Sequence, residues 1–166
     1  MDLLTRWIHV LATGAYLGST LAIALVVLPA ATAIEDPALQ RRMLARALRP
    51  YNVLSVGALG VLVISGASGL ADYRARLVLE PGALASGAFG HVFGRLVWKL
   101  SLTFVLINVA TYLSFGLAHR LVRAELGSLP VEPEKQASMV ARMRAVAWLG
   151  VGLAAWTIWV GLRLAP

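Results

Sequence analysis

The stretch WIHVLATGAYLGSTLAIALVVLPAA, from Trp7 to Ala31, decides the fold class. It contains no Asp, Glu, Lys or Arg. An α-helix rises 1.5 Å per residue, so about 20 apolar residues are enough to cross the hydrocarbon core of a bilayer. In lipid, only a helix satisfies the backbone hydrogen bonds of a single segment internally. The stretch therefore predicts a transmembrane helix.

Three further apolar stretches follow the first, and each is long enough to span a bilayer. They are 51–70, 96–117 and 145–162, beside 7–31 for the first. The chain has 166 residues, of which 59% are hydrophobic and 14% charged, and a soluble domain of this size cannot bury so much apolar surface. We predict an all-α protein with one integral membrane domain over residues 1–166. Short connections favour an antiparallel four-helix bundle.

The first stretch has an alternative interpretation as a secretory signal, because Ala31-Thr32-Ala33 follows it like a cleavage site. The stretch is longer than the apolar region of a typical signal, and it carries a regular polar stripe. We therefore expect it to be a membrane helix.

The connection after the first span contains a short basic segment, PALQRRMLARAL. Asp36 and Pro37 are typical of an N-cap and a first helical residue. Four arginines in or directly after the segment predict a short interfacial helix on the membrane surface, ending where Pro50 precedes the second span. These are Arg41, Arg42, Arg46 and Arg49.

Basic residues are distributed unevenly between the two ends of the predicted bundle. Nine of the 15 Lys and Arg residues fall in the first and third connections: Arg41, Arg42, Arg46, Arg49, Arg120, Arg123, Lys135, Arg142 and Arg144. The positive-inside rule then places both termini on the non-cytoplasmic side, and we expect the inner (plasma) membrane of a bacterium. The net charge of +7 suits anionic lipid head groups rather than nucleic acid. With no cysteine, disulfides and thiolate sites are excluded.

Polar residues recur along one face of the first span, at steps of three and four. They are Asp2, Arg6, His9, Thr13, Tyr16 and Thr20. Lipid penalises such a stripe, so we expect it to face the bundle interior. The third span carries two polar faces, one with Arg95, Lys99, Thr103 and Ser114, and one nearly opposite with Ser101, Asn108, Tyr112 and His119. Because a four-helix bundle covers only one of these faces easily, the second predicts a homo-oligomer or a partner membrane subunit.

Antiparallel packing brings the ionisable residues of separate spans to one depth. The start of the first span then meets the end of the second at Ser68 and Asp72, and the start of the third meets the end of the fourth. The sequence thus predicts a ligand site in the non-cytoplasmic half of the bilayer. Its candidate cofactor-binding residues are His9, Lys99, Tyr16, Arg95 and Thr13, and its candidate metal ligands are His9 and His91.

Each candidate also has a simpler interpretation. His9 could be an interfacial histidine, Lys99 could extend to the membrane surface along its stem, and His91 could be a solvated residue of a connection. No motif of a soluble enzyme is present, and no catalytic residue is assigned. With three histidines in all, the chain cannot hold two haems with bis-histidine ligation, so we expect at most one haem b or one copper ion. The copper interpretation is weakened because Met139 and Met143 fall on the side opposite His9.

Three segments resemble a known family. WIHVLATGAYLGSTLAIALVVLPA, LVISG and FGRLVWKLSLTFVLINVA are similar to the first three helices of the CopD copper-resistance family. More distantly, the chain resembles the protoporphyrinogen oxidases of HemJ type, which share a histidine in the first helix and a lysine early in the third. The resemblance implies a protein that binds or transports copper, or holds a haem b on His9 with Lys99 as a charged partner. An accessory subunit of a larger membrane complex is the third hypothesis.

Overall fold

The computed structural model describes residues 3–79 and 88–163, and every regular element in this part of the chain is helical. The all-α prediction is therefore confirmed. The elements are α1 (Leu3–Ala22), the π-helix η1 (Ile23–Val27), α2 (Leu28–Thr32), α3 (Pro37–Leu79), α5 (Ala88–Thr111), the π-helix η2 (Tyr112–Ala118), α6 (His119–Glu125) and α7 (Pro133–Leu162).

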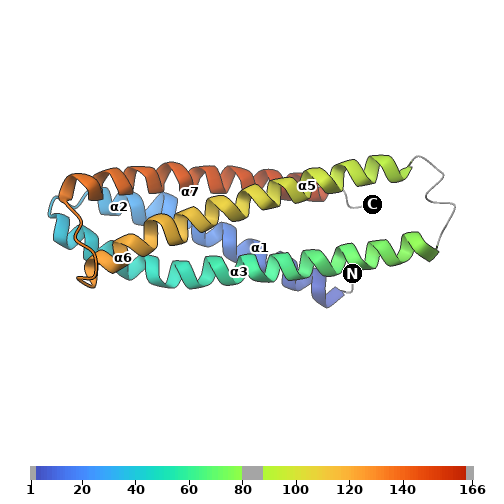
Figure 1. The fold of residues 1–166 in the computed structure, drawn as a ribbon, viewed down its shortest axis with the longest axis horizontal. Helices are drawn as coiled ribbons and strands as arrows, with labels where there is room; N and C mark the ends of the chain where they lie inside the picture. The colour runs from blue at the N-terminus through green and yellow to red at the C-terminus, as the bar shows by residue number, and fades with distance from the viewer. Residues whose placement is uncertain (1–2, 80–87, 164–166) are drawn as a thin grey trace.

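These elements form four long rods that pass along one axis of the molecule (Figure 1). The described residues contain four helices long and apolar enough to cross a membrane: Leu3–Thr32, Pro37–Asp72, Leu96–Glu125 and Pro133–Leu162. The chain is thus an integral membrane protein with a four-helix bundle. Each span is longer than the sequence predicted, because segments interpreted as polar connections continue the helices.

The rods pack unequally along the bundle. α1 lies along α3 and also contacts α7, while α5 packs mainly on α7. α3 contacts the third rod chiefly at α6. Toward the end where the termini lie, the ribbons of α3 and α5 diverge (Figure 1). One apolar cluster fills the α6 end, with Leu28, Leu48, Leu121 and Met143 fully buried. A second surrounds Tyr16 nearer the termini.

The end of the first span belongs to this core. Ala31, the first residue of the signal-like Ala31-Thr32-Ala33, is fully buried in the apolar cluster at the α6 end. The π-helix η1 just before it has a local cause. Pro29 has no N–H and its ring crowds the carbonyl four residues earlier. The Leu28 N–H bonds to the Ile23 oxygen instead, five residues back, which widens the turn.

The expected short interfacial helix is not a separate element. α3 is one helix of 43 residues with Pro50 inside it, so the predicted boundary at Pro50 is wrong. The reason is packing: Leu44 and Leu48 are fully buried in the bundle core, which holds the basic segment in line with the span. Proline costs one hydrogen bond and some steric strain inside a helix, and neighbouring helices make this tolerable in membrane proteins.

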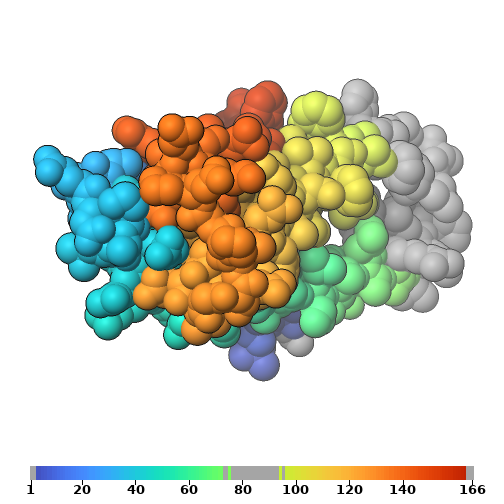
Figure 2. Space-filling model, turned by 60° about the vertical axis from the view of Figure 1, so that its left-hand side comes forward, coloured from blue at the N-terminus to red at the C-terminus, as the bar shows by residue number. Residues whose placement is uncertain are grey.

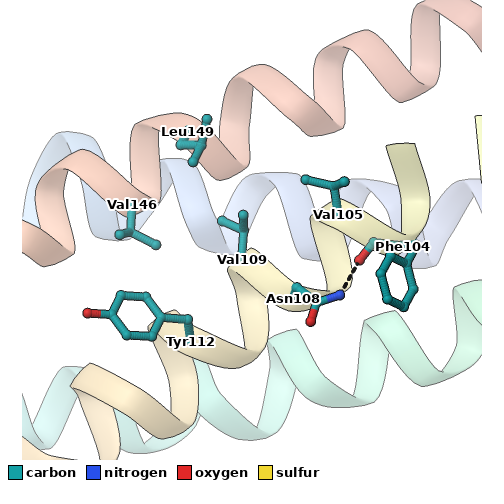
Figure 3. Close-up of a pocket in the computed structure, with 7 residues that line it drawn as sticks. All are labelled: Phe104, Val105, Asn108, Val109, Tyr112, Val146 and Leu149. Carbon is teal, nitrogen blue, oxygen red and sulfur yellow. Dashed lines mark hydrogen bonds between the residues drawn. The ribbon is translucent and has the colours of Figure 1, made fainter. Parts of the chain in front are cut away.

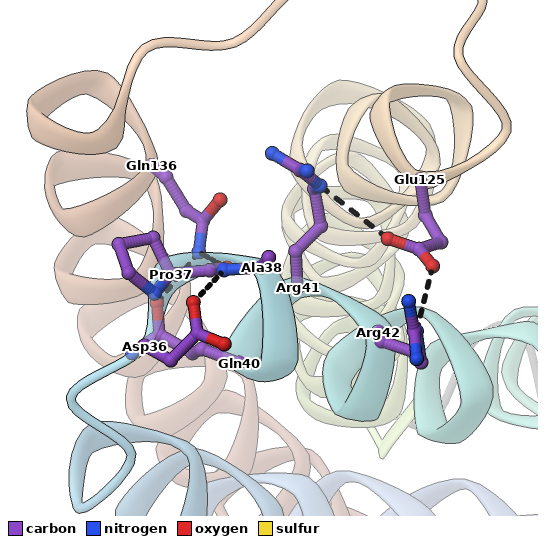
Figure 4. A network of polar contacts seen from close by, with 8 residues as sticks. All are labelled: Asp36, Pro37, Ala38, Gln40, Arg41, Arg42, Glu125 and Gln136. Carbon is purple, nitrogen blue, oxygen red and sulfur yellow. Dashed lines mark hydrogen bonds and ion pairs between the residues drawn. The ribbon is translucent and has the colours of Figure 1, made fainter.

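A polar network ties the beginning of α3 to α6 and α7 (Figure 4). Asp36 caps the helix as predicted, because its side chain accepts the Ala38 N–H at 2.9 Å. The buried Gln136 amide of α7 donates to the Pro37 carbonyl at 2.9 Å and to the Gln40 side chain at 2.7 Å.

The arginines of the same segment reach α6. Arg41 and Arg42 both pair with Glu125, at 3.4 Å and 3.5 Å. Figure 2 shows the result from the basic end: the beginning of α3, in cyan, lies beside α6 and the beginning of α7, in orange. This end of the bundle is thus fastened by polar contacts as well as by the apolar cluster.

Candidate functional site

At the opposite end of the bundle, His9 of α1 contacts α3 through a hydrogen bond. The His9 Nδ1 atom lies 2.8 Å from the Ser65 hydroxyl oxygen. Ser65 is buried, while His9 is half-buried and accessible from outside. The predicted meeting of the first span's start with the second span's end is confirmed at this pair. Ser65 is one helical turn before the predicted Ser68.

The hydrogen bonds of Ser65 determine which histidine nitrogen carries the proton. A serine hydroxyl has one proton to donate. Ser65 donates it to the Val61 carbonyl at 2.7 Å, with the Leu62 carbonyl a second acceptor at 3.2 Å. If Ser65 donates its proton to Val61, His9 donates its Nδ1–H to Ser65, and the lone pair of a neutral ring is then on Nε2. Within the described residues Nε2 has no hydrogen-bond partner.

Lys99 of α5 contacts α7 toward the same end of the bundle. Its ammonium group lies against Gly161 of α7, where a Cβ atom would be 3.5 Å from Nζ. Lys99 is half-buried, and no carboxylate in the described part of the chain pairs with it. Two contacts between rods thus lie toward the end where the termini are: His9 with Ser65 joins α1 to α3, and Lys99 with Gly161 joins α5 to α7.

Aromatic residues border this end of the bundle on α5 and α7. Trp98 and Trp156 pack edge to face with centroids 6.4 Å apart, and the Arg163 guanidinium lies 4.0 Å from the Trp159 ring centre. Each of the three tryptophans is about half exposed. Half-exposed tryptophans are typical of the aromatic belt that membrane proteins have at the membrane interface.

Other predicted site residues lie elsewhere. Tyr16 is buried as the stripe predicted, but it is two helical turns deeper than His9, and a Cβ at Gly150 would lie 3.6 Å from its hydroxyl. Thr13 bonds back to the His9 carbonyl at 2.8 Å, so its proton is already used. The backbone of His91 belongs to α5 and not to a connection. The side chains of His91 and Arg95 lie outside the described residues.

A deeper group of buried hydroxyls was not predicted as a unit. Ser55 of α3 and Ser114 of η2 are 3.2 Å apart and fully buried, and Thr20 of α1 is buried as well. The Tyr51 hydroxyl lies near Thr20 and Ser55 but makes no hydrogen bond of good geometry. No charged residue belongs to this group, which makes it a structural contact between helices rather than a ligand site.

The donors at the His9 level do not form a metal cage. No group of three or more His, Cys, Asp or Glu side chains is placed to hold a metal ion among the described residues. Met143 is fully buried in the apolar cluster at the other end of the bundle. The site offers one imidazole lone pair and one ammonium group.

Searches against protein-family models, curated proteins and solved structures find no match for this chain.

Proposed function

We propose that the protein binds one haem b near His9, which would hold the haem iron through its Nε2 atom. The observation that carries this proposal is the hydrogen bond from His9 Nδ1 to Ser65. Histidines that ligate a metal usually donate their other ring N–H to a fixed acceptor, which sets the tautomer and the ring orientation. Ser65 acts in this way because its own proton is used on the Val61 carbonyl.

The residues at this level fit a haem better than a copper ion. A copper site needs several convergent donors, and the described side chains contain no group of three or more His, Cys, Asp or Glu that could hold a metal ion. A copper ion would also be repelled by the nearby ammonium of Lys99. A haem needs only one ligand from this chain. Its two propionate groups are negatively charged, and one of them could pair with Lys99, which has no carboxylate partner among the described residues.

The surroundings of the site also support the proposal. His9 is half-buried and not sealed in the core, so a large planar group can reach Nε2 from outside. A bound haem would supply one-electron transfer at this depth of the membrane. The chain itself would hold the ring through His9 and the propionates through Lys99.

We further propose that the His9 level is on the non-cytoplasmic side of a bacterial inner membrane. The basic residues of α6 and of the beginnings of α3 and α7 support this orientation, because they gather at the end opposite the termini (Figure 1). Alkaline phosphatase fused to the C-terminus is expected to be active in an inner membrane of this orientation. An inactive fusion, with an active one in the 126–132 connection, would reverse it.

Haem titration of the purified protein tests the function. The wild type in detergent is expected to take up one haem per chain and to develop a Soret band of a histidine-ligated haem. His9→Ala is expected to lose this band. His119→Ala is the matched control, because His119 is exposed on α6 at the other end of the bundle. Equal haem uptake by the His9 variant, or stoichiometric copper with no haem in the wild type, would contradict the proposal.

A further inference from the structure

The outer face of α5 and η2 carries polar side chains that the bundle leaves exposed. Ser101, Asn108, Tyr112 and His119 are all exposed, so the second polar face predicted from the sequence is not covered by the other three rods. The span has no charged residue between Lys99 and Arg120, a stretch of about 20 residues that matches the hydrocarbon thickness. Asn108 lies close to the middle of this stretch and hence at the bilayer centre.

Asn108 has unused hydrogen-bonding capacity at this depth. Its Nδ2 atom donates to the Phe104 carbonyl of its own helix at 2.8 Å (Figure 3). A carboxamide has two N–H groups and an oxygen with two lone pairs. The second N–H and the oxygen therefore have no partner within the described residues. Hydrocarbon supplies neither donors nor acceptors, so leaving these groups in lipid is unfavourable.

Asn108 is on the rim of an open groove of about 380 Å³ between the third and fourth rods (Figure 3). The groove is lined by Phe104, Val105, Asn108, Val109, Tyr112, Val146 and Leu149. The Tyr112 ring forms one wall and lies over Gly116, where a Cβ atom would come within 2.8 Å of it. An apolar groove alone is ordinary on a surface that faces lipid. The carboxamide on its rim is what requires a polar partner.

We propose that this face binds a second copy of the chain, and that the two Asn108 side chains meet at the centre of a two-fold dimer. A carboxamide is self-complementary: the second N–H of each Asn108 donates to the oxygen of the other. Copies of one membrane protein insert in the same direction, so their two-fold axis lies along the membrane normal and brings equal residue numbers together. The groove beside Asn108 then gives space for exposed aromatic side chains such as Phe104 of the second copy.

Dimerisation measured in lipid vesicles tests the carboxamide contact. Asn108→Leu is expected to weaken the dimer by about 10- to 100-fold, since two interhelical hydrogen bonds are lost. Single-molecule photobleaching over a series of protein-to-lipid ratios measures the dimer fraction. Ser68→Ala is the matched control, because the exposed Ser68 hydroxyl also bonds to a carbonyl four residues back, at 3.1 Å, but lies on α3. The control is expected to dimerise like the wild type.

Disulfide cross-linking tests the position of the axis, and the natural chain has no cysteine to interfere. Ser101→Cys and Phe115→Cys lie one heptad on either side of Asn108, and both are expected to cross-link to the same residue of the other copy. Ile64→Cys, which is 71% exposed on α3, is expected to form no disulfide cross-link. A wild type that is monomeric at every lipid ratio, an unaffected Asn108→Leu dimer, equal cross-linking at residue 64, or a different subunit bound across Asn108 would each overturn the proposal.

Discussion

Replacing Ser65 by alanine removes the acceptor of the His9 Nδ1–H bond and changes little else. The Ser65 hydroxyl also donates to the Val61 carbonyl, but that oxygen still accepts its ordinary helical N–H after the change. Ser65 is buried, and alanine is the smaller side chain, so no new clash arises. The substitution therefore tests the orientation of the His9 ring while His9 itself stays in place.

The expected size of the effect follows from the 2.8 Å hydrogen bond between His9 and Ser65. Loss of such an outer partner of a ligating histidine typically costs 10- to 100-fold in affinity, or about 1.4–2.8 kcal/mol. The same bond joins α1 to α3, and one interhelical hydrogen bond in a membrane protein stabilises the fold by about 0.6–2 kcal/mol. We expect haem affinity to fall 10- to 100-fold in Ser65→Ala while the protein remains folded.

The assay is a haem titration in detergent, followed by the Soret absorbance, with thermal unfolding measured on the same samples. Ser65→Thr keeps a hydroxyl and is expected to restore most of the affinity. Ser68→Ala removes a hydroxyl one turn further along α3 that bonds only to its own helix, and it is expected to bind like the wild type. If folded Ser65→Ala binds haem as tightly as the wild type, the assigned orientation of His9 is wrong.

Three further substitutions test other contacts. Lys99→Met is expected to weaken haem binding about tenfold while Lys99→Arg keeps it, because under the proposal the half-buried charge would pair with a propionate; equal titration curves would argue against this pairing. Gln136→Leu is expected to lower the free energy of unfolding by about 1–2 kcal/mol, since the Pro37 and Gln40 contacts are lost; an unchanged midpoint in thermal unfolding would refute this. Tyr51→Phe is expected to raise the free energy of unfolding by about 1 kcal/mol, because the buried hydroxyl has no hydrogen-bond partner; a lower value would show that the hydroxyl is satisfied in the membrane.

Much of the fold could be predicted from the sequence because membrane spans need long apolar stretches. The four spans, the cap at Asp36 and the inward orientation of Tyr16 and Thr20 all follow from local pattern. The helix boundaries were less predictable. α3 continues through Pro50 because Leu44 and Leu48 are buried against distant residues, and such burial depends on tertiary packing.

The candidate site was predictable in depth but not in its contacts. Helical spacing predicted His9 and Lys99 at one level, and the structure pairs His9 with Ser65 and sets Lys99 against Gly161. The same spacing included Tyr16 with His9, although two turns of helix separate them. The contact between Gly161 and Lys99 could not be predicted from the local sequence, because it depends on where the Lys99 side chain reaches α7. The π-helix η2 was also missed, since the sequence has no proline there to indicate it.

Quantifying the ligand of the purified protein tests the central claim most directly. The claim is that His9, which pairs with Ser65, and Lys99, which lies against Gly161, together hold a haem. Protein extracted from membranes in mild detergent is assayed for haem by pyridine haemochrome and for copper by mass spectrometry, each per mole of chain. The account predicts haem approaching one per chain and negligible copper. Copper near one per chain without haem would contradict it.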